Sequence, residues 1–117
     1  MDAQQRLARE HALERCRERG IVIPTLAEQR DPSRLDAALA ARIAALDLDA
    51  VDPLNLFRIT WHNDPATGGF GPVNAFELPP ELTGVPARIV GLVGRHFPTG
   101  AHKVGAAFGC LVPRLCA

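Results

Sequence analysis

The chain has 117 residues, and its 13 basic and 13 acidic residues give a formal net charge of zero at pH 7. This balance gives no indication of the strongly basic surface typical of proteins that bind nucleic acid or an anionic membrane, so we expect neither as a partner. No segment has the apolar length of a membrane span, and the charged N-terminus does not resemble a signal peptide. We therefore expect a cytoplasmic protein.

Residues 1–50 are expected to form a helical N-terminal segment. A charged helix is predicted from Asp2 to Arg19, with Gly20 as its left-handed C-terminal cap. Its narrow apolar stripe is typical of a helix that lies on a partner surface. Thr25 with Glu28 three residues later predicts a capping box at a brief turn.

A second helix is predicted to begin at Asp31, with Pro32 in its first turn. Apolar residues repeat at helical spacing along one face, which predicts core or docking surface. These residues are Leu35, Leu39, Ile43 and Leu46. The face carries no titratable group, so we assign it no chemistry.

Residues 51–117 are expected to begin an α/β domain. Asp52-Pro53 marks a boundary, and residues 56–61 predict a strand or edge segment. Residues 62–72 are dense in turn formers and predict an exposed loop, which either covers an active site or only connects two strands. A strand is predicted over residues 73–78, with Asn74 and Glu77 as surface residues.

The residues around Lys103 carry the main functional signal. Residues 87–93 have the β-branched, apolar character of a buried strand, and residues 104–111 favour a helix. Lys103 is therefore expected on a glycine loop near a helix N-terminus, where the helix dipole and burial would both favour the neutral, nucleophilic amine. The alternative is that Lys103 is a solvated surface lysine.

At this point the sequence resembles a known family. The string Thr99-Gly100-Ala101-His102-Lys103 looks like the cofactor-lysine segment of the tryptophan synthase β and cysteine synthase family, the fold type II enzymes that use pyridoxal 5′-phosphate. Residues 19–24, 52–61 and 103–115 resemble a less characterised branch described as β-subunit-like.

The resemblance implies the N-terminal part of a fold type II α/β enzyme that holds pyridoxal 5′-phosphate as a Schiff base on Lys103. It implies β-elimination or β-replacement on an amino-acid substrate, by a lyase or a cysteine-synthase-like enzyme that is a homo-oligomer at full length. By the same carry-over, Thr99, Gly100 and His102 would contact the cofactor, with His102 at its phosphate. His102 has an equally simple alternative as a solvent-facing residue at the start of the helix.

The chain also departs from the family pattern. Gly105 stands where tryptophan synthases have asparagine, and the cysteine synthase arrangement around the lysine is absent, so neither named activity transfers directly. Enzymes of this fold type are several times longer, and the loops that hold the phosphate and the substrate carboxylate come later in them. We therefore expect an N-terminal portion that is inactive alone; the alternative is a non-catalytic fragment or subunit that needs a partner or the missing part to bind cofactor.

Other site types fit less well. Gly100 and Lys103 lack Walker-loop spacing, and no GxGxxG follows a strand. The histidines and cysteines between His96 and Cys116 match no zinc pattern, so we expect no metal. Three cysteines without CxxC spacing, namely Cys16, Cys110 and Cys116, favour reduced thiols packed as small apolar groups.

Overall fold

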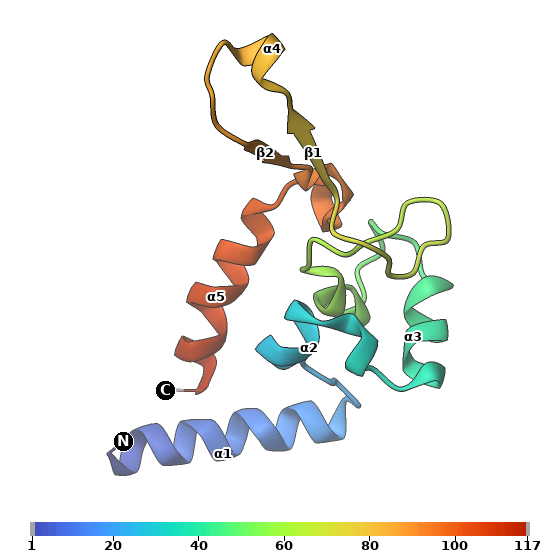
Figure 1. The fold of residues 1–117 in the computed structure, drawn as a ribbon. Helices are drawn as coiled ribbons and strands as arrows, with labels where there is room; N and C mark the ends of the chain where they lie inside the picture. Colours follow the sequence, from blue (N-terminus) through green and yellow to red (C-terminus); the bar gives the residue numbers. More distant parts are fainter. Residues whose placement is uncertain (1, 117) are drawn as a thin grey trace.

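The computed structural model describes residues 2–116, and side chains as far as Leu111 (Figure 1). The α-helices are α1 (Ala3–Glu18), α2 (Leu26–Arg30), α3 (Ala37–Ala44), α4 (Pro80–Thr83) and α5 (Lys103–Cys116). Four 3₁₀ turns lie among them in the described part: η1 (Pro32–Arg34), η2 (Pro53–Arg58), η3 (Gly94–His96) and η4 (Pro98–Gly100). Strands β1 (Ala75–Leu78) and β2 (Ile89–Leu92) form a two-stranded antiparallel sheet.

The molecule is elongated, with principal extents of 58 × 34 × 23 Å. The hairpin of β1 and β2 projects at one end with α4 at its tip, and α1 lies across the other end (Figure 1). Helix α5 runs from the base of the hairpin towards α1 and contacts it. Within residues 2–116, no helix combines the length and apolar character needed to cross a bilayer.

The predicted caps at Gly20 and Thr25 are confirmed, and Asp2 provides a further one. Asp2 caps α1 through a hydrogen bond from the Gln5 N–H, and Gly20 has a φ of +61° just beyond the end of the helix. The Thr25 hydroxyl accepts from the Glu28 N–H at 3.2 Å, and the Glu28 carboxylate accepts from the Thr25 N–H at 2.7 Å. Short polar side chains therefore start both α1 and α2 as their spacing indicates.

The prediction of one helix beginning at Asp31 is wrong. Asp31 caps only the turn η1, Leu35 is extended, and α3 begins again after Asp36. The carboxylate of Asp36 accepts from the Leu39 N–H at 2.9 Å, so a second strong N-cap competes with continuation of the first turn. The predicted apolar face is kept on the shorter helix, with Ile43 fully buried.

The strand predicted at residues 56–61 is also wrong. Residues 53–58 form the turn η2, which Asp52 caps through a bond from the Leu54 N–H at 2.8 Å. Pro53 sets the φ of the first position and has no N–H to lose. Irregular backbone follows from Ile59 to Trp61.

The apolar core is small and lies around η2, which contacts both α2 and α3. Its buried apolar side chains include Ile43, Phe57, Ile59 and Phe97. Phe97 comes from the segment that leads into α5, so the C-terminal part of the chain is attached to this core through few side chains.

The hairpin pairs Ala75 with Leu92 and Leu78 with Ile89. The prediction that residues 87–93 form a buried strand is wrong in its burial, because Val90 and Leu92 are 49% and 50% exposed. A two-stranded sheet has no second layer here to cover these side chains. The chain thus combines helices with a small antiparallel sheet, which fits the general α/β class expected, and a loop leads from β2 to the lysine helix.

The capping role of Asp36 leads to a first prediction. Replacing Asp36 by alanine removes the acceptor for the Leu39 N–H, so we expect a loss of about 1 kcal/mol in the free energy of unfolding. Urea denaturation followed by circular dichroism measures it. Asp49→Ala, which removes an exposed carboxylate outside α3, is the control and should change the stability by less than about 0.5 kcal/mol. Equal effects of the two changes would contradict the cap.

Candidate functional site

Lys103 is the first residue of α5, and its side chain is exposed. The loop before it contains η3 and η4 and begins one residue after β2, so the predicted order of strand, loop and helix is present. Lys103 is not buried in this chain, so the expectation of a buried amine is wrong. Thr99, Gly100 and His102 are exposed with it, and the four predicted residues lie on one short surface segment.

The loop before α5 holds backbone strain at Thr99. Among the described residues, Thr99 is the one residue other than glycine with a positive φ, at +66°. Gly100, which follows it, has a φ of +68°. A β-branched residue is disfavoured in this region, and such strain is often stored at functional sites. The adjacent Gly100 N–H donates to the Phe97 carbonyl at 3.0 Å and fixes the turn.

His102 rests on the single tryptophan of the chain. The His102 and Trp61 rings are stacked with centroids 5.8 Å apart, and Phe97 meets Trp61 edge-on at 4.9 Å. Gly94 allows this arrangement, because a Cβ at that position would lie 2.9 Å from His102 Nδ1. The imidazole is therefore positioned by an aromatic contact, although one of its faces is open to solvent.

The residues present fit the covalent part of a pyridoxal phosphate site. Lys103 offers an accessible primary amine, and a Cβ at Gly100 would meet no heavy atom within 4 Å, so the outer side of the loop has room for a bulky group. His102 supplies a cationic or hydrogen-bonding group one residue away. The described residues would leave a cofactor bound to Lys103 exposed to solvent, whereas a complete cofactor site encloses most of its ligand.

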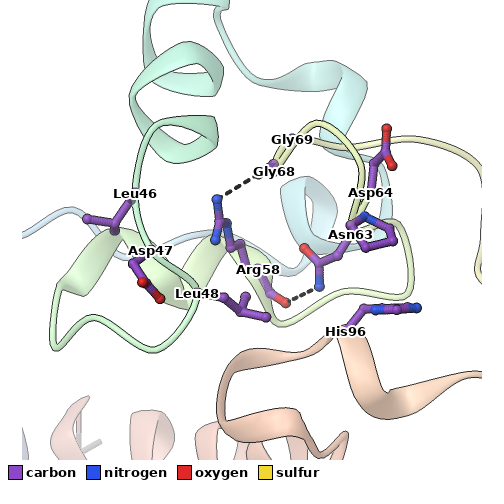
Figure 2. Close-up of a pocket in the computed structure, with 10 residues that line it drawn as sticks. Leu46, Asp47, Leu48, Arg58, Asn63, Asp64, Gly68, Gly69 and His96 are labelled. Atoms are coloured by element: carbon purple, nitrogen blue, oxygen red, sulfur yellow. Dashed lines mark hydrogen bonds between the residues drawn. The ribbon is translucent and has the colours of Figure 1, made fainter.

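A separate pocket of about 370 Å³ lies between the end of α3, η2 and the loop of residues 63–69 (Figure 2). Arg58 and Asn63 are the buried polar side chains in its wall, only 3% and 5% exposed. Two carboxylates and an imidazole also line it, from Asp47, Asp64 and His96. Lys103 is not among its lining residues.

The guanidinium of Arg58 joins α3 to the following loop. Its Nη2 donates to the carbonyl of Ile43 in the last turn of α3 and, at 2.6 Å, to the carbonyl of Gly68 (Figure 2). Gly68 has a φ of +70°, and a Cβ there would lie 2.7 Å from the Ala44 carbonyl oxygen. Burial lowers the pKa of Arg58 and the charge of Asp47 opposes the shift, but an arginine remains protonated throughout the ordinary pH range.

Side-chain amides hold the rest of this irregular region. The Asn63 amide donates to the carbonyls of Arg58 and Thr60 at 2.7 and 3.0 Å. The Asn74 amide donates to the carbonyls of Trp61 and Asn63 at 3.1 and 2.6 Å, so Asn74, expected as a surface residue, is half-buried and holds the backbone. Asn63 lies in a loop expected to be exposed, but it is buried because its amide donates to two backbone carbonyls.

Sequence reasoning missed Arg58 and Asn63. The sequence pattern predicts a strand at Arg58 and a turn-rich loop at Asn63, and neither pattern indicates burial. The one available signal was the position of Arg58 between Phe57 and Ile59, because a cation flanked by large apolar residues is often drawn into the interior with a polar partner.

The cysteines differ from one another. Cys16 is half-buried and free, and Cys110 is free and exposed, so the expectation of a packed thiol is wrong for Cys110. The side chain of Cys116 lies outside the described part. Among the described side chains, no three histidine, cysteine or acidic residues gather as a metal site would require.

Comparison with known proteins gives no neighbour from which to assign a function. No protein-family model matches the chain, and neither a curated protein nor a solved structure matches it at a significant level.

The hydrogen bonds of Arg58 give a second prediction. Arg58→Met should lower the free energy of unfolding by about 2–4 kcal/mol, because the buried carbonyls of Ile43 and Gly68 lose their donor. Thermal or urea denaturation measures the loss. Arg42→Met removes an exposed arginine from α3 and should stay within about 0.5 kcal/mol of the wild type. A stable Arg58→Met variant would exclude a structural role for the guanidinium.

Asp64 gives a third prediction, on pH. The Ala66 N–H and then the Thr67 hydroxyl donate to its carboxylate and hold its pKa below the ordinary value of 3.8. Its stabilising contribution is therefore present above the unfolded-state pKa and is lost as the pH falls through the folded-state pKa. Thr67→Val should raise the pKa, measured by NMR titration of the carboxyl carbon. Thr83→Val, in another part of the chain, should leave it unchanged; equal pKa values in wild type and Thr67→Val would contradict the assignment.

Proposed function

We propose that Lys103 binds pyridoxal 5′-phosphate covalently and that the chain is the lysine-bearing part of an amino-acid lyase or synthase. The observation that carries the proposal is the placement of the single lysine, exposed at the first turn of α5 directly after the strained Thr99–Gly100 loop. Its amine is accessible to the cofactor aldehyde, and the neighbouring motif resembles the cofactor-lysine segment of fold type II enzymes.

In this proposal each residue has a separate task. The Lys103 amine would condense with the aldehyde with loss of water, and once the substrate amine displaced it, the freed amine would give or take the proton at the substrate Cα. His102, held on Trp61, binds the cofactor phosphate, and the open side of Gly100 admits the ring. When bound, pyridoxal phosphate supplies an electron-withdrawing ring that stabilises negative charge at Cα. The substrate is an amino acid, and the reaction is β-elimination or β-replacement in a homo-oligomer.

A second candidate is a subunit that binds cofactor only with a partner, and the surface of the chain favours it. The accessible surface is 8243 Å², whereas a compact monomer of 12.6 kDa exposes about 6,200 Å². The radius of gyration is 17.4 Å against about 13 Å for a compact domain of this length. Together with the uncovered Lys103, this supports the candidate in which another chain or segment closes the site.

A fourth prediction tests the covalent proposal. The chain is mixed with limiting pyridoxal phosphate, reduced with borohydride and mapped by mass spectrometry. Its other primary amine is the α-amine of Met1, and α-amines have a pKa of about 7.7–8.0 against about 10.4 for lysine. Unselective labelling at pH 7 would therefore favour Met1, so a label mainly on Lys103 requires a binding site. We expect that label, and expect it to disappear in Lys103→Arg.

Two controls separate a site from simple reactivity. The preference for Lys103 should disappear in urea, and His102→Ala should reduce labelling by pyridoxal phosphate but not by pyridoxal, which lacks the phosphate. Labelling that stays mainly on Met1 in the folded chain would exclude a formed site in this chain alone. Selective labelling that appears only after a second protein is added would favour the subunit candidate.

A further inference from the structure

We propose that the pocket between the end of α3, η2 and residues 63–69 binds a small zwitterion that carries an ammonium and a carboxylate group (Figure 2). This proposal does not depend on Lys103, which does not line the pocket. It rests on the charges of the wall and on two buried polar atoms that have no partner.

Arg58 provides the cationic side of the pocket. Its side chain is 3% exposed, and the acceptors it has are two backbone carbonyls, from Ile43 and Gly68. Among the described side chains, no carboxylate lies within ion-pair distance of Arg58. The ion pair that these side chains form is Arg88 with Glu77, on the hairpin. The charge of Asp47 acts on Arg58 without a direct ion pair, so the guanidinium can still accept the approach of a carboxylate.

Asp47 and Asp64 provide the anionic groups, which lie on opposite sides of Arg58 in Figure 2. Both carboxylates line the same pocket, Asp47 at its exposed rim and Asp64 half-buried. Each already accepts from a nearby N–H, Asp47 from Asp49 at 2.8 Å and Asp64 from Ala66 at 2.9 Å, which orders the carboxylates. They repel a simple anion, and Arg58 repels a simple cation. A neutral molecule with one group of each charge is attracted by Arg58 through its carboxylate and by an aspartate through its ammonium group.

Two buried atoms in the wall indicate hydrogen bonds that remain to be made. Arg58 Nε is a donor without an acceptor, and Asn63 Oδ1 is an acceptor without a donor. Both atoms are shielded from solvent, so a carboxylate would accept from the first and an ammonium N–H would donate to the second only after the Arg58 and Asn63 side chains turn towards the pocket. Because buried polar groups in folded proteins are usually satisfied, this pair of complementary deficits points to a ligand with both functions.

The size of the pocket limits the ligand. A volume of about 370 Å³ lies at the lower end of the range of small-molecule sites and leaves room for molecules larger than glycine, so glycine serves as the minimal probe that carries both charges. Ordered water is the simplest competing occupant, since it can both donate and accept.

The experiment is a titration of the full ¹⁵N-labelled chain, without pyridoxal phosphate, with glycine, acetate, methylammonium and glycine betaine. We expect glycine to shift the amide signals of Asn63, Gly68 and Gly69 with a Kd on the order of 1 mM. Acetate and methylammonium each lack one charge and should bind at least about tenfold more weakly. Betaine, whose quaternary ammonium has no N–H, should also bind more weakly because it cannot donate to Asn63.

A matched pair of variants tests the wall. Asp47→Asn keeps an acceptor for the Asp49 N–H but removes the rim charge, and it should weaken glycine binding by about tenfold. Asp49→Asn removes an exposed carboxylate two residues away that does not line the pocket, and it should change the Kd by less than about twofold. The amide spectrum of each variant reports whether it is folded, so an unfolded variant is not misread.

Three results would overturn the proposal. Equal binding of acetate and glycine would show a simple anion site, and no shift with any probe would show that water alone fills the pocket. Equal weakening by Asp47→Asn and Asp49→Asn would show only a general charge effect. Labelling of Lys103 is unaffected by any of these outcomes, so this proposal and the cofactor proposal fail separately.

Discussion

The fold of this chain depends on side-chain donors that satisfy backbone carbonyls where no helix or strand does so. The region from the end of α3 to β1 is mostly irregular, and its buried carbonyls would be unsatisfied without them. Arg58, Asn63 and Asn74 each donate to two such carbonyls. These bonds join the end of α3, the turn η2 and the start of β1 around a core of few apolar side chains, so polar contacts carry specificity that a larger apolar core would otherwise provide.

The sequence predicted what is decided locally. The Thr25 box and the Gly20 cap depend on residues within a few positions of one another, and those residues act as expected. The strand expected at residues 56–61 failed because its apolar residues suit a strand and a 3₁₀ turn equally, and the choice depends on Asp52 and on Arg58 reaching two distant carbonyls. The pocket could not be predicted at all, since its wall comes from segments that only the tertiary fold brings together.

For Lys103 too, the sequence predicts the local features but not those that depend on the tertiary fold. Its position at the start of a helix after a strand and a glycine loop could be read from the residues alone. Its exposure could not, because burial depends on which elements cover the loop, and in the described chain none covers Lys103. Trp61 links the two regions of interest, because it follows η2 closely in sequence and stacks on His102 beside the lysine.

The hairpin of β1 and β2 has a consequence for the behaviour of the protein in solution. Each strand of a two-stranded sheet has one edge with unpaired N–H and C=O groups, and here Phe76, Val90 and Leu92 expose about half of their surface beside those edges. Such edges are templates for intermolecular strand pairing, and one ion pair, Arg88 with Glu77, provides the charge near them. At high concentration the chain should therefore aggregate through this hairpin first, and charged substitutions on its apolar positions are the rational means of keeping it monodisperse.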